Sequence, residues 1–240
     1  RYVALKMVMS GSEKRVRFKV VEDDGRELPA DSDWAKEVRS NERNITDAEL
    51  REMLAVRHFG FDPSDFSKGG DATCHFCARV ADSDYVKAEG SAKRMGQQMM
   101  AIVCTRLGRQ GKVYLSADDY AQFVPHEAAI QELIDDLCRK TGLSVPTEPI
   151  ITDAKNSCWT PLYGLSTFGD LFNPRQMLSL LSFAYSVRAA GTATEKACYS
   201  QEHAVAVMTA LACVVDKQAD FNSSLCVLKS DGGRGVVHTF

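Results

Sequence analysis

Alternation of apolar and polar residues opens the chain and predicts a β-hairpin over residues 2–21. Ser10-Gly11-Ser12 supplies its turn. In the second strand, apolar residues alternate with basic ones, so that one face is suited to burial and the other is basic. These residues are Val16, Phe18 and Val20 on the apolar face, and Arg15, Arg17 and Lys19 on the basic face.

Helical spacing replaces this alternation further along the chain. Thr46 and Glu49 form a capping box before a short helix. Methionines and other apolar residues between 95 and 103 predict a helix with one buried side and one basic side. A further helix follows Pro125, and Gly142 stops it.

The best-specified helix start lies at Asn173, where four local features agree. Asn173 is a favourable N-cap, Pro174 suits the first helical position, and Gln176 is placed to close a capping box. Phe172 and Met177 occupy the two places of a hydrophobic staple.

The C-terminal region is predicted to hold two long helices. The helix that starts at Asn173 is expected to end near Gly191, because glycine is common just past a helix end. Thr192 and Glu195 then offer a capping box for an apolar helix that runs to about Gln218.

The helix start at Asn173 is also a candidate anion site. Free backbone N–H groups and partial positive charge gather there, and Arg175 in the first turn adds a full charge, which suits a phosphate or a carboxylate. The alternative is that Arg175 pairs with Asp170 and that the loop only packs, since surface ion pairs are common and weak.

Together these elements predict an α+β fold with two parts. Residues 1–142 are expected to form a zinc-ribbon-like α+β region with a β-hairpin and a basic helix. Residues 143–158 are predicted to be a linker that contains prolines, and residues 159–240 a mainly helical region.

Composition places the chain among folded globular proteins. It has 240 residues, of which 45% are hydrophobic and 25% charged. No apolar run is long enough to span a bilayer, no signal peptide opens the chain, and no membrane partner is expected. The 8 cysteines are scattered, several of them in apolar helical stretches, so a reduced, cytoplasmic protein is expected.

Local charge adds a candidate interaction surface. The net charge of −3 gives no indication of nucleic-acid binding by the whole chain, but residues 87–112 carry six basic residues and one acid, a local charge of +5. This stretch is a candidate phosphate-facing patch, and the alternative is a solvated helix face followed by a charged turn. The basic residues are Lys87, Lys93, Arg94, Arg106, Arg109 and Lys112.

Cys74 and Cys77 form the metal-like motif of the sequence. A C-x2-C pair can take two corners of a tetrahedral zinc, but a structural zinc has four ligands and the sequence holds no second such pair. His75 is expected to point away from the turn. A redox pair is the alternative, although such pairs normally open a helix and Gly69-Gly70-Asp71 indicates a loop. No catalytic constellation is found.

Three phrases resemble segments of the large adenine-specific DNA methylases that carry an inserted zinc ribbon. They occur in the same order as in that family and cover most of residues 71–240. The phrases are GGDATCHFCARVADSDYVKAEGSAKRMGQQMMAIV with GRQGKVYLSADD, then YGLSTFGDLFNPRQMLSLLSF, then FNSSLCVL. The opening RYVALKMV is also similar to the segment after the first cysteine pair of the family.

The resemblance implies that the chain is an internal segment of a methylase. The S-adenosylmethionine loop of the family would lie before Arg1 and its Asp-Pro-Pro-Tyr catalytic motif after Phe240, so the chain alone is expected to be inactive. In that family the amine of a flipped adenine attacks the methyl group of S-adenosylmethionine, and the enzyme must grip the phosphates around the base. The implied partners are double-stranded DNA and the remaining methylase domains.

The resemblance also suggests roles for particular residues. Lys93, Arg94, Arg106, Arg109 and Lys112 would contact the DNA backbone.

Asp170, Asn173, Arg175 and Gln176 would organise the region near the cofactor or the target base.

Cys74 and Cys77 would be half of a zinc site that is incomplete in this chain, because the other cysteine pair of the family lies upstream. The family knuckle reads Cys-Pro-x-Cys-Gly, whereas His75 and Ala78 stand here, and the tight turn loses its glycine.

Two other functions remain open for this sequence. One is a free-standing zinc-ribbon module that binds nucleic acid or protein. The other is a thiol-redox protein that uses Cys74 and Cys77, which would be free of metal and reversibly oxidised.

Overall fold

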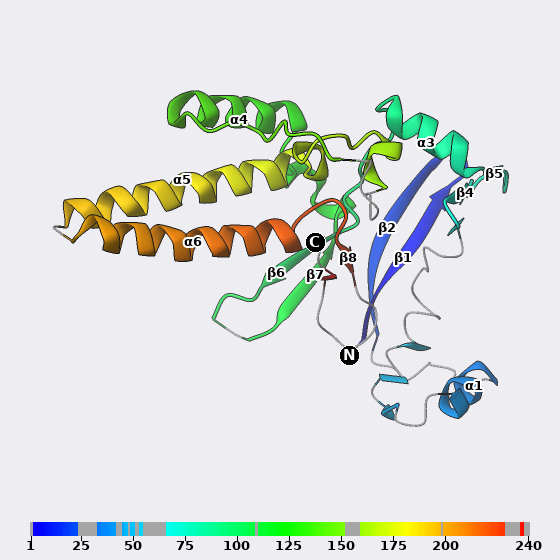
Figure 1. Cartoon of the computed structure of the whole chain (residues 1–240). Coiled ribbons are helices and arrows are strands. Elements are labelled where there is room, and N and C mark those ends of the chain that lie inside the picture. The colour runs from blue at the N-terminus through cyan, green and yellow to red at the C-terminus, as the bar shows by residue number, and fades with distance from the viewer. Residues whose placement is uncertain are drawn as a thin grey trace. The chain divides into compact units, whose positions relative to one another are not determined.

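The computed structural model of the chain divides into two compact units, Arg1–Val124 and Pro125–Phe240. It describes residues 2–23, 33–41, 45–47, 49–50, 53–54, 66–108, 110–151, 159–197, 199–228 and 236–237. Small antiparallel sheets lie in the first unit and the long helices in the second, so the predicted α+β class is confirmed (Figure 1). No helix in the described ranges is long and apolar enough to cross a membrane.

The first unit is built from short antiparallel pairs. Its strands are β1 (Tyr2–Ser10), β2 (Arg15–Asp23), β3 (Ser67–Lys68), β4 (Asp71–Thr73), β5 (Val80–Ala81), β6 (Ala101–Thr105) and β7 (Lys112–Ser116). Its helices are α1 (Asp33–Asn41), α3 (Ser83–Ser91) and the 3-10 helix η2 (Asp118–Phe123). The strand orders are β1-β2, β3-β4-β5 and β6-β7.

The predicted opening hairpin is confirmed as β1 and β2. In its register Lys6 lies opposite Lys19, and Met7 opposite Phe18. Phe18 and the apolar residues on its face of β2 are half-buried, whereas the basic residues of β2 are exposed, as the alternation predicts. The second strand therefore has one packed face and one basic face.

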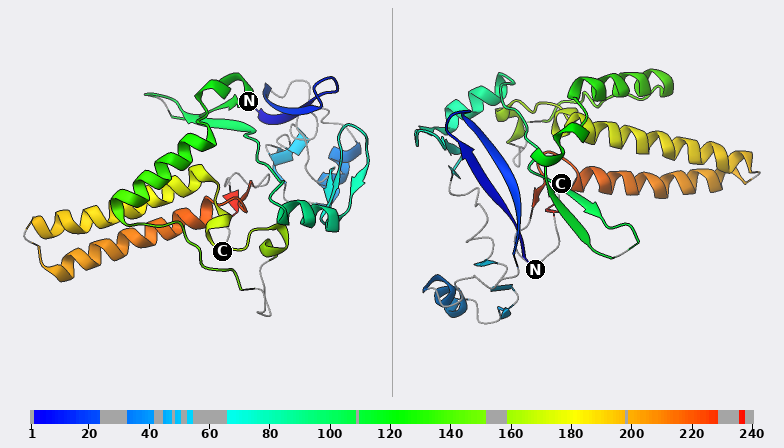
Figure 2. Two further views of the ribbon diagram at one scale, coloured as in Figure 1. Left: turned by 90° about the horizontal axis from the view of Figure 1, so that it is seen from above. Right: turned by 180° about the vertical axis from the view of Figure 1, so that it is seen from behind.

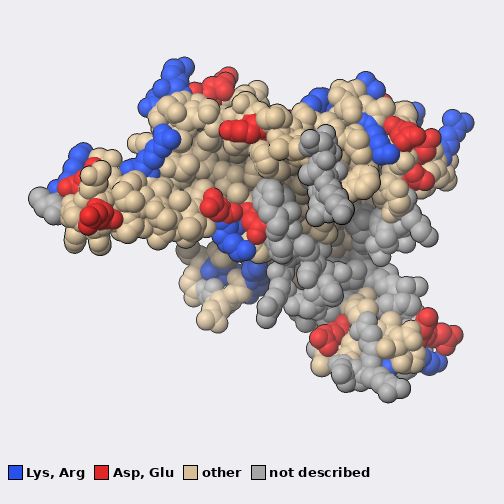
Figure 3. Space-filling view, in the orientation of Figure 1, with Lys and Arg blue, Asp and Glu red and all other residues tan. Residues whose placement is uncertain are grey.

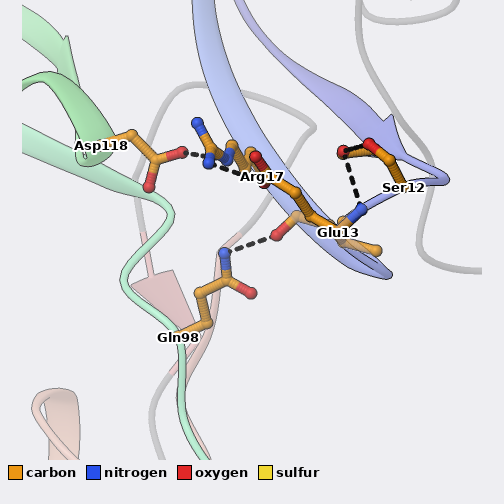
Figure 4. A network of polar contacts seen from close by, with 7 residues as sticks. Ser12, Glu13, Arg17, Gln98 and Asp118 are labelled. Atoms are coloured by element: carbon orange, nitrogen blue, oxygen red, sulfur yellow. Dashed lines mark hydrogen bonds and ion pairs between the residues drawn. The ribbon is translucent and has the colours of Figure 1, made fainter.

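Polar contacts tie this hairpin to segments much later in the chain. The backbone N–H of Val20 donates to Oγ of Ser116 at 2.9 Å. Nε2 of Gln98 donates to the carbonyl of Val16 at 2.9 Å, and the Arg17 guanidinium lies 3.9 Å from the carboxylate of Asp118 (Figure 4). Strand β2 thus finds partners on β7, on η2 and in the strand-free segment before β6.

The predicted short helix after Thr46 has the capping box that its sequence implies. The backbone N–H of Thr46 donates to the Glu49 carboxylate at 2.8 Å, and the N–H of Glu49 donates to Oγ1 of Thr46 at 3.3 Å. Leu50 and Leu54 are buried against Ala35 of α1. This small cluster is the apolar core of that part of the chain.

The predicted basic helix is wrong over most of its length. Helix α3 ends at Ser91, residues 94–100 contain neither helix nor strand, and β6 begins at Ala101. Gly96 and the β-branched residues after Ala101 favour an extended chain, and Met95 is exposed rather than buried. Helical spacing of methionines alone is not sufficient to predict a helix.

The second unit is a layer of helices with short additions. It contains α4 (Glu127–Thr141), the 3-10 helices η3 (Thr160–Tyr163) and η4 (Gly169–Leu171), α5 (Pro174–Lys196), α6 (Gln201–Phe221), and the strands β8 (Val227–Leu228) and β9 (Val236–Val237). Helix α5 lies between α4 and α6 and contacts both, and α5 and α6 form an antiparallel pair (Figures 1 and 2). Ile130 and Ile134 of α4 are buried against Met177 and Leu181 of α5.

The boundary between the units lies before α4 and not after it. The sequence predicts α4 in the N-terminal part, but its buried isoleucines pack on α5. Gly142 ends α4 in the left-handed conformation, with φ of 67°, as predicted. Residues 143–151 do not form a free linker, because Leu143 and Val145 pack against the same core. The rest of the expected linker, residues 152–158, lies outside the described residues.

The predicted break at Gly191 is wrong, because α5 continues to Lys196. Thr192 lies inside the helix, and its Oγ1 donates to the carbonyl of Arg188 at 3.3 Å. The N-cap of α6 is instead Ser200, whose side chain accepts from the backbone N–H of His203. Gly191 is buried where a Cβ would lie 2.2 Å from Sδ of Met208 on α6. The glycine allows close helix packing and does not end the helix.

Candidate metal and nucleic-acid site

Cys74 and Cys77 lie in the tight turn that joins β4 to β5. Thr73 pairs with Val80 across the hairpin. The N–H of Cys74 donates to the carbonyl of Arg79 at 2.8 Å, and the N–H of Ala78 donates to the carbonyl of Cys74 at 2.9 Å. We refer to residues 74–78 as the cysteine knuckle. Both thiols are exposed and free.

The knuckle favours the thiolate form of Cys74. The backbone N–H groups of Phe76 and Cys77, followed by the thiol of Cys77, hydrogen-bond to the Cys74 sulfur and lower the pKa of its thiol below the ordinary value. A thiolate that accepts amide hydrogen bonds from its own turn is the form that binds zinc. The described turn is a β-hairpin turn and not a helix start, which is unlike the usual setting of a redox pair.

Ala78 takes the conformation that a glycine would take in this turn. Its φ is 55°, in the left-handed region that a residue with a Cβ adopts at a cost of about 1–2 kcal/mol. The turn therefore forms without the glycine, and the hydrogen bonds that close the hairpin offset the cost.

The knuckle supplies two metal ligands and no more from the described residues. No group of three or more His, Cys, Asp or Glu side chains in the described ranges is placed to hold a metal ion. The His75 ring packs edge-on against Phe66, with 4.1 Å between ring centroids, and its buried Nδ1 has no hydrogen-bond partner among the described residues. Two thiols would account for two of the four ligands of a tetrahedral zinc.

The basic residues of the 87–112 stretch lie in two places in the first unit. Lys93 and Arg94 follow the end of α3, where Lys93 has a φ of 56°. Arg106 and Lys112 lie at the turn end of the β6–β7 hairpin, where the N–H of Arg106 donates to the carbonyl of Gly111. In Figures 1 and 2, α3 and this turn are well separated. Arg109 lies outside the described residues.

Arg94 is paired with Glu89, and Lys87 is paired with Asp84. Nε and Nη2 of Arg94 donate to the Glu89 carboxylate at 2.8 and 2.6 Å. This hydrogen-bonded pair raises the pKa of Arg94 and lowers the pKa of Glu89. Arg106 and Lys112, both exposed, are better placed to meet a phosphate.

Asp170 holds together the loop that precedes α5. Its carboxylate accepts from the backbone N–H groups of Ser166 and Thr167 at 3.0 and 2.9 Å, and from both hydroxyls. Arg175 is exposed, and within the described residues it makes no ion pair with Asp170. The alternative in which these two side chains pair is therefore not observed.

Asn173 and Gln176 form the predicted reciprocal capping box. Oδ1 of Asn173 accepts from the N–H of Gln176 at 3.0 Å, and the N–H of Asn173 donates to Oε1 of Gln176 at 2.9 Å. Oε1 of Gln176 also accepts from the Ser224 hydroxyl at 3.4 Å. These side chains position the start of α5 against the segment after α6, and their side-chain oxygens are engaged in these hydrogen bonds.

A basic surface to which the sequence assigns no role lies on the β1–β2 hairpin. Pairing brings Lys6 of β1 beside Lys19 of β2, on the same face as Arg15 and Arg17. The alternation in β2 indicates this face, and the contribution of β1 follows from the strand register, which the turn between Ser10 and Arg15 sets.

Comparison with known proteins gives no match: no family model, no curated protein and no solved structure is similar to this chain.

Proposed function

We propose that the chain is a DNA-binding and scaffold segment of an S-adenosylmethionine-dependent, adenine-specific DNA methyltransferase of the cytoplasm. The cysteine knuckle is the observation that carries this proposal. A hairpin turn with exposed thiols and amide groups directed at Cys74 is what one half of a zinc ribbon requires. It lies in the phrase that resembles the zinc-ribbon region of those methylases.

In the proposed function the first unit grips the DNA backbone. Lys93, Arg106 and Lys112 are exposed cations within a few tens of residues of the knuckle, and backbone contacts of this kind fix the register of a protein on duplex DNA. Zinc, held by Cys74 and Cys77 together with two ligands from elsewhere, would fix the ribbon. S-adenosylmethionine would be bound by the remaining methylase domains, where it supplies the methyl group.

The second unit offers a surface for those domains. Helix α6 is apolar along much of its length, yet Val205, Leu211 and Val214 are 49%, 38% and 57% exposed. Figure 3 shows charged side chains at both ends of the α5–α6 pair and a stretch without them along its middle. Apolar surface of this kind is typical of interfaces with other protein domains. Asp170, Asn173 and Gln176 support this role by fixing the start of α5.

A free-standing zinc-ribbon module that binds nucleic acid is the second candidate, and the same knuckle favours it. The two candidates share DNA binding and differ in whether methylase domains accompany the chain. The intact mass of the native gene product separates them, because a methylase would be several times larger than the 26.4 kDa of this chain.

Duplex DNA binding is the experiment that tests the shared part of the proposal. Fluorescence polarisation of a labelled duplex is measured as salt is raised from about 50 to about 200 mM, and the affinity should fall steeply. Replacing Arg106 and Lys112 by glutamine should reduce the salt slope by about two. The control removes the same charge at two exposed lysines of the second unit, Lys196 and Lys217, and should leave the slope unchanged. Absence of binding by the unaltered chain would contradict the proposed function.

A further inference from the structure

The exposed face of the β1–β2 hairpin carries four cations on its strands, and one of them, Arg17, is paired with Glu13. Strand pairing places Lys6, Val8 and Ser10 of β1 on this face, opposite Lys19, Arg17 and Arg15 of β2 respectively. The four basic side chains and Val8 are exposed. The opposite face holds Leu5, Met7, Val16, Phe18 and Val20, which are half-buried, and also Val3 and Met9, which are exposed. We call the exposed side the basic ribbon face.

Two of its lysines are placed where they weaken the hairpin. Lys6 and Lys19 are directly opposed in the register, and like charges in that position are destabilising. Neither forms an ion pair with an acid in the described part of the chain. Arg17 differs, since it is paired with Glu13 at 2.8 Å and lies near Asp118 (Figure 4). An unrelieved repulsion on an exposed face indicates that the face meets an anion.

The dimensions of this ribbon suit duplex DNA. Each strand has 9 residues, and Arg15 to Lys19 spans about 13 Å at the rise of an antiparallel strand. The major groove of B-form DNA is about 12 Å wide and admits a two-stranded β-ribbon. The sheet contains β1 and β2 alone, and the basic side chains of the ribbon face are exposed.

On the basis of the proposed DNA binding, we propose that the basic ribbon face docks on duplex DNA, with Lys6, Arg15 and Lys19 against backbone phosphates at the edge of the major groove. Arg17 holds the ribbon to η2 through Asp118 while Glu13 braces its side chain. The A-form duplex of RNA has a deep, narrow major groove that a ribbon does not enter, so DNA is the favoured ligand.

The test uses the full chain of 240 residues and a fluorescein-labelled DNA duplex of about 20 base pairs, roughly two helical turns. Lys6→Gln combined with Lys19→Gln removes two cations, and the slope of log affinity against log salt should fall by about two. Lys6→Arg combined with Lys19→Arg keeps the charge and should restore the slope. The matched control is the Lys196→Gln and Lys217→Gln pair, which should leave it unchanged.

Folding of the variant is followed separately. Because the glutamine pair relieves the repulsion across the hairpin, its melting temperature should be equal to or above that of the unaltered chain. Weaker DNA binding at equal or higher stability is not a result that a purely structural role for these lysines would give.

Four results would overturn the inference. An unaltered slope in the glutamine variant, with binding still sensitive to Arg106 and Lys112, would overturn it while leaving the proposed function in place. An equal fall of the salt slope in the Lys196 and Lys217 control would show that any cation on the surface contributes equally to DNA binding. Failure of the unaltered chain to bind DNA, or tighter binding to a duplex RNA of the same sequence, would also exclude it, and the former would contradict the proposed function as well.

Discussion

At the scale of single residues, Ala78 shows how a tight turn forms with a residue that disfavours the conformation required there. The energetic cost of its φ of 55° is offset by two backbone hydrogen bonds, from the N–H of Cys74 to the carbonyl of Arg79 and from the N–H of Ala78 to the carbonyl of Cys74. Left-handed backbone strain of this kind, beside a thiol whose pKa is lowered, is common at sites that bind a ligand.

Ala78→Gly should stabilise the knuckle by about 1 kcal/mol, because glycine adopts positive φ without the Cβ penalty. The measurement is hydrogen exchange of the Cys74 amide, which the Arg79 carbonyl protects. It should slow about fivefold if local opening controls exchange.

The control for this prediction is Ala72→Gly in the adjoining strand β4. Its backbone is extended, so glycine there adds only flexibility and should speed exchange. Faster exchange of the Cys74 amide in the Ala78 variant than in the unaltered chain would mean that backbone strain at Ala78 does not limit the stability of the turn.

At the scale of elements, the opening hairpin of the first unit depends on side-chain contacts to β2. The side chains of Ser116 and Gln98 hydrogen-bond to backbone groups of β2. They come from segments about eighty to a hundred residues away in the sequence. Ser116 is 8% exposed, so its Oγ is shielded where it accepts from Val20. A two-stranded hairpin is only marginally stable in isolation, and these contacts stabilise it further.

Ser116→Ala should destabilise the first unit by about 1–3 kcal/mol, because the N–H of Val20 loses its partner in a part-buried place. Urea denaturation and hydrogen exchange of the Val20 amide measure the effect. Ser12→Ala, in the exposed hairpin turn, serves as the matched control and should change stability by less than about 0.5 kcal/mol. Equal stability of the two variants would show that the Ser116 contact contributes little.

At the scale of the whole molecule, the two units differ in how they are held together. The first unit consists of small sheets, short helices and polar ties, and the second has an apolar core between α4 and α5 and a close α5–α6 pair. An acidic chain, with a net charge of −3, thus carries an exposed basic face on one hairpin.

The unit boundary yields a prediction that separates the two possible divisions of the chain. Residues 125–240 expressed alone should keep the helical circular dichroism signal, because α4 and its core partners stay together. A fragment that starts at residue 143 lacks Ile130 and Ile134, and should lose roughly 3–6 kcal/mol of stability from the apolar burial of two isoleucines. Equal thermal stability of the two fragments would place the boundary after α4 instead.

The sequence by itself determined the features that depend on neighbouring residues. The hairpin alternation around Phe18, the capping boxes at Thr46 and Asn173, and the stop at Gly142 all arise from contacts within a few positions. Local hydrogen bonds and side-chain periodicity are written directly in the order of residues, so these predictions are confirmed by the structure.

Only the tertiary structure decided the features that depend on distant partners. The local pattern predicts a helix end at Gly191, but it is the close approach of Met208 that explains a glycine there. The unit to which α4 belongs depends on Met177 and Leu181, and the support of β2 depends on Ser116 and Gln98. Packing brings together residues far apart in sequence, and no local pattern specifies which of those encounters the chain adopts.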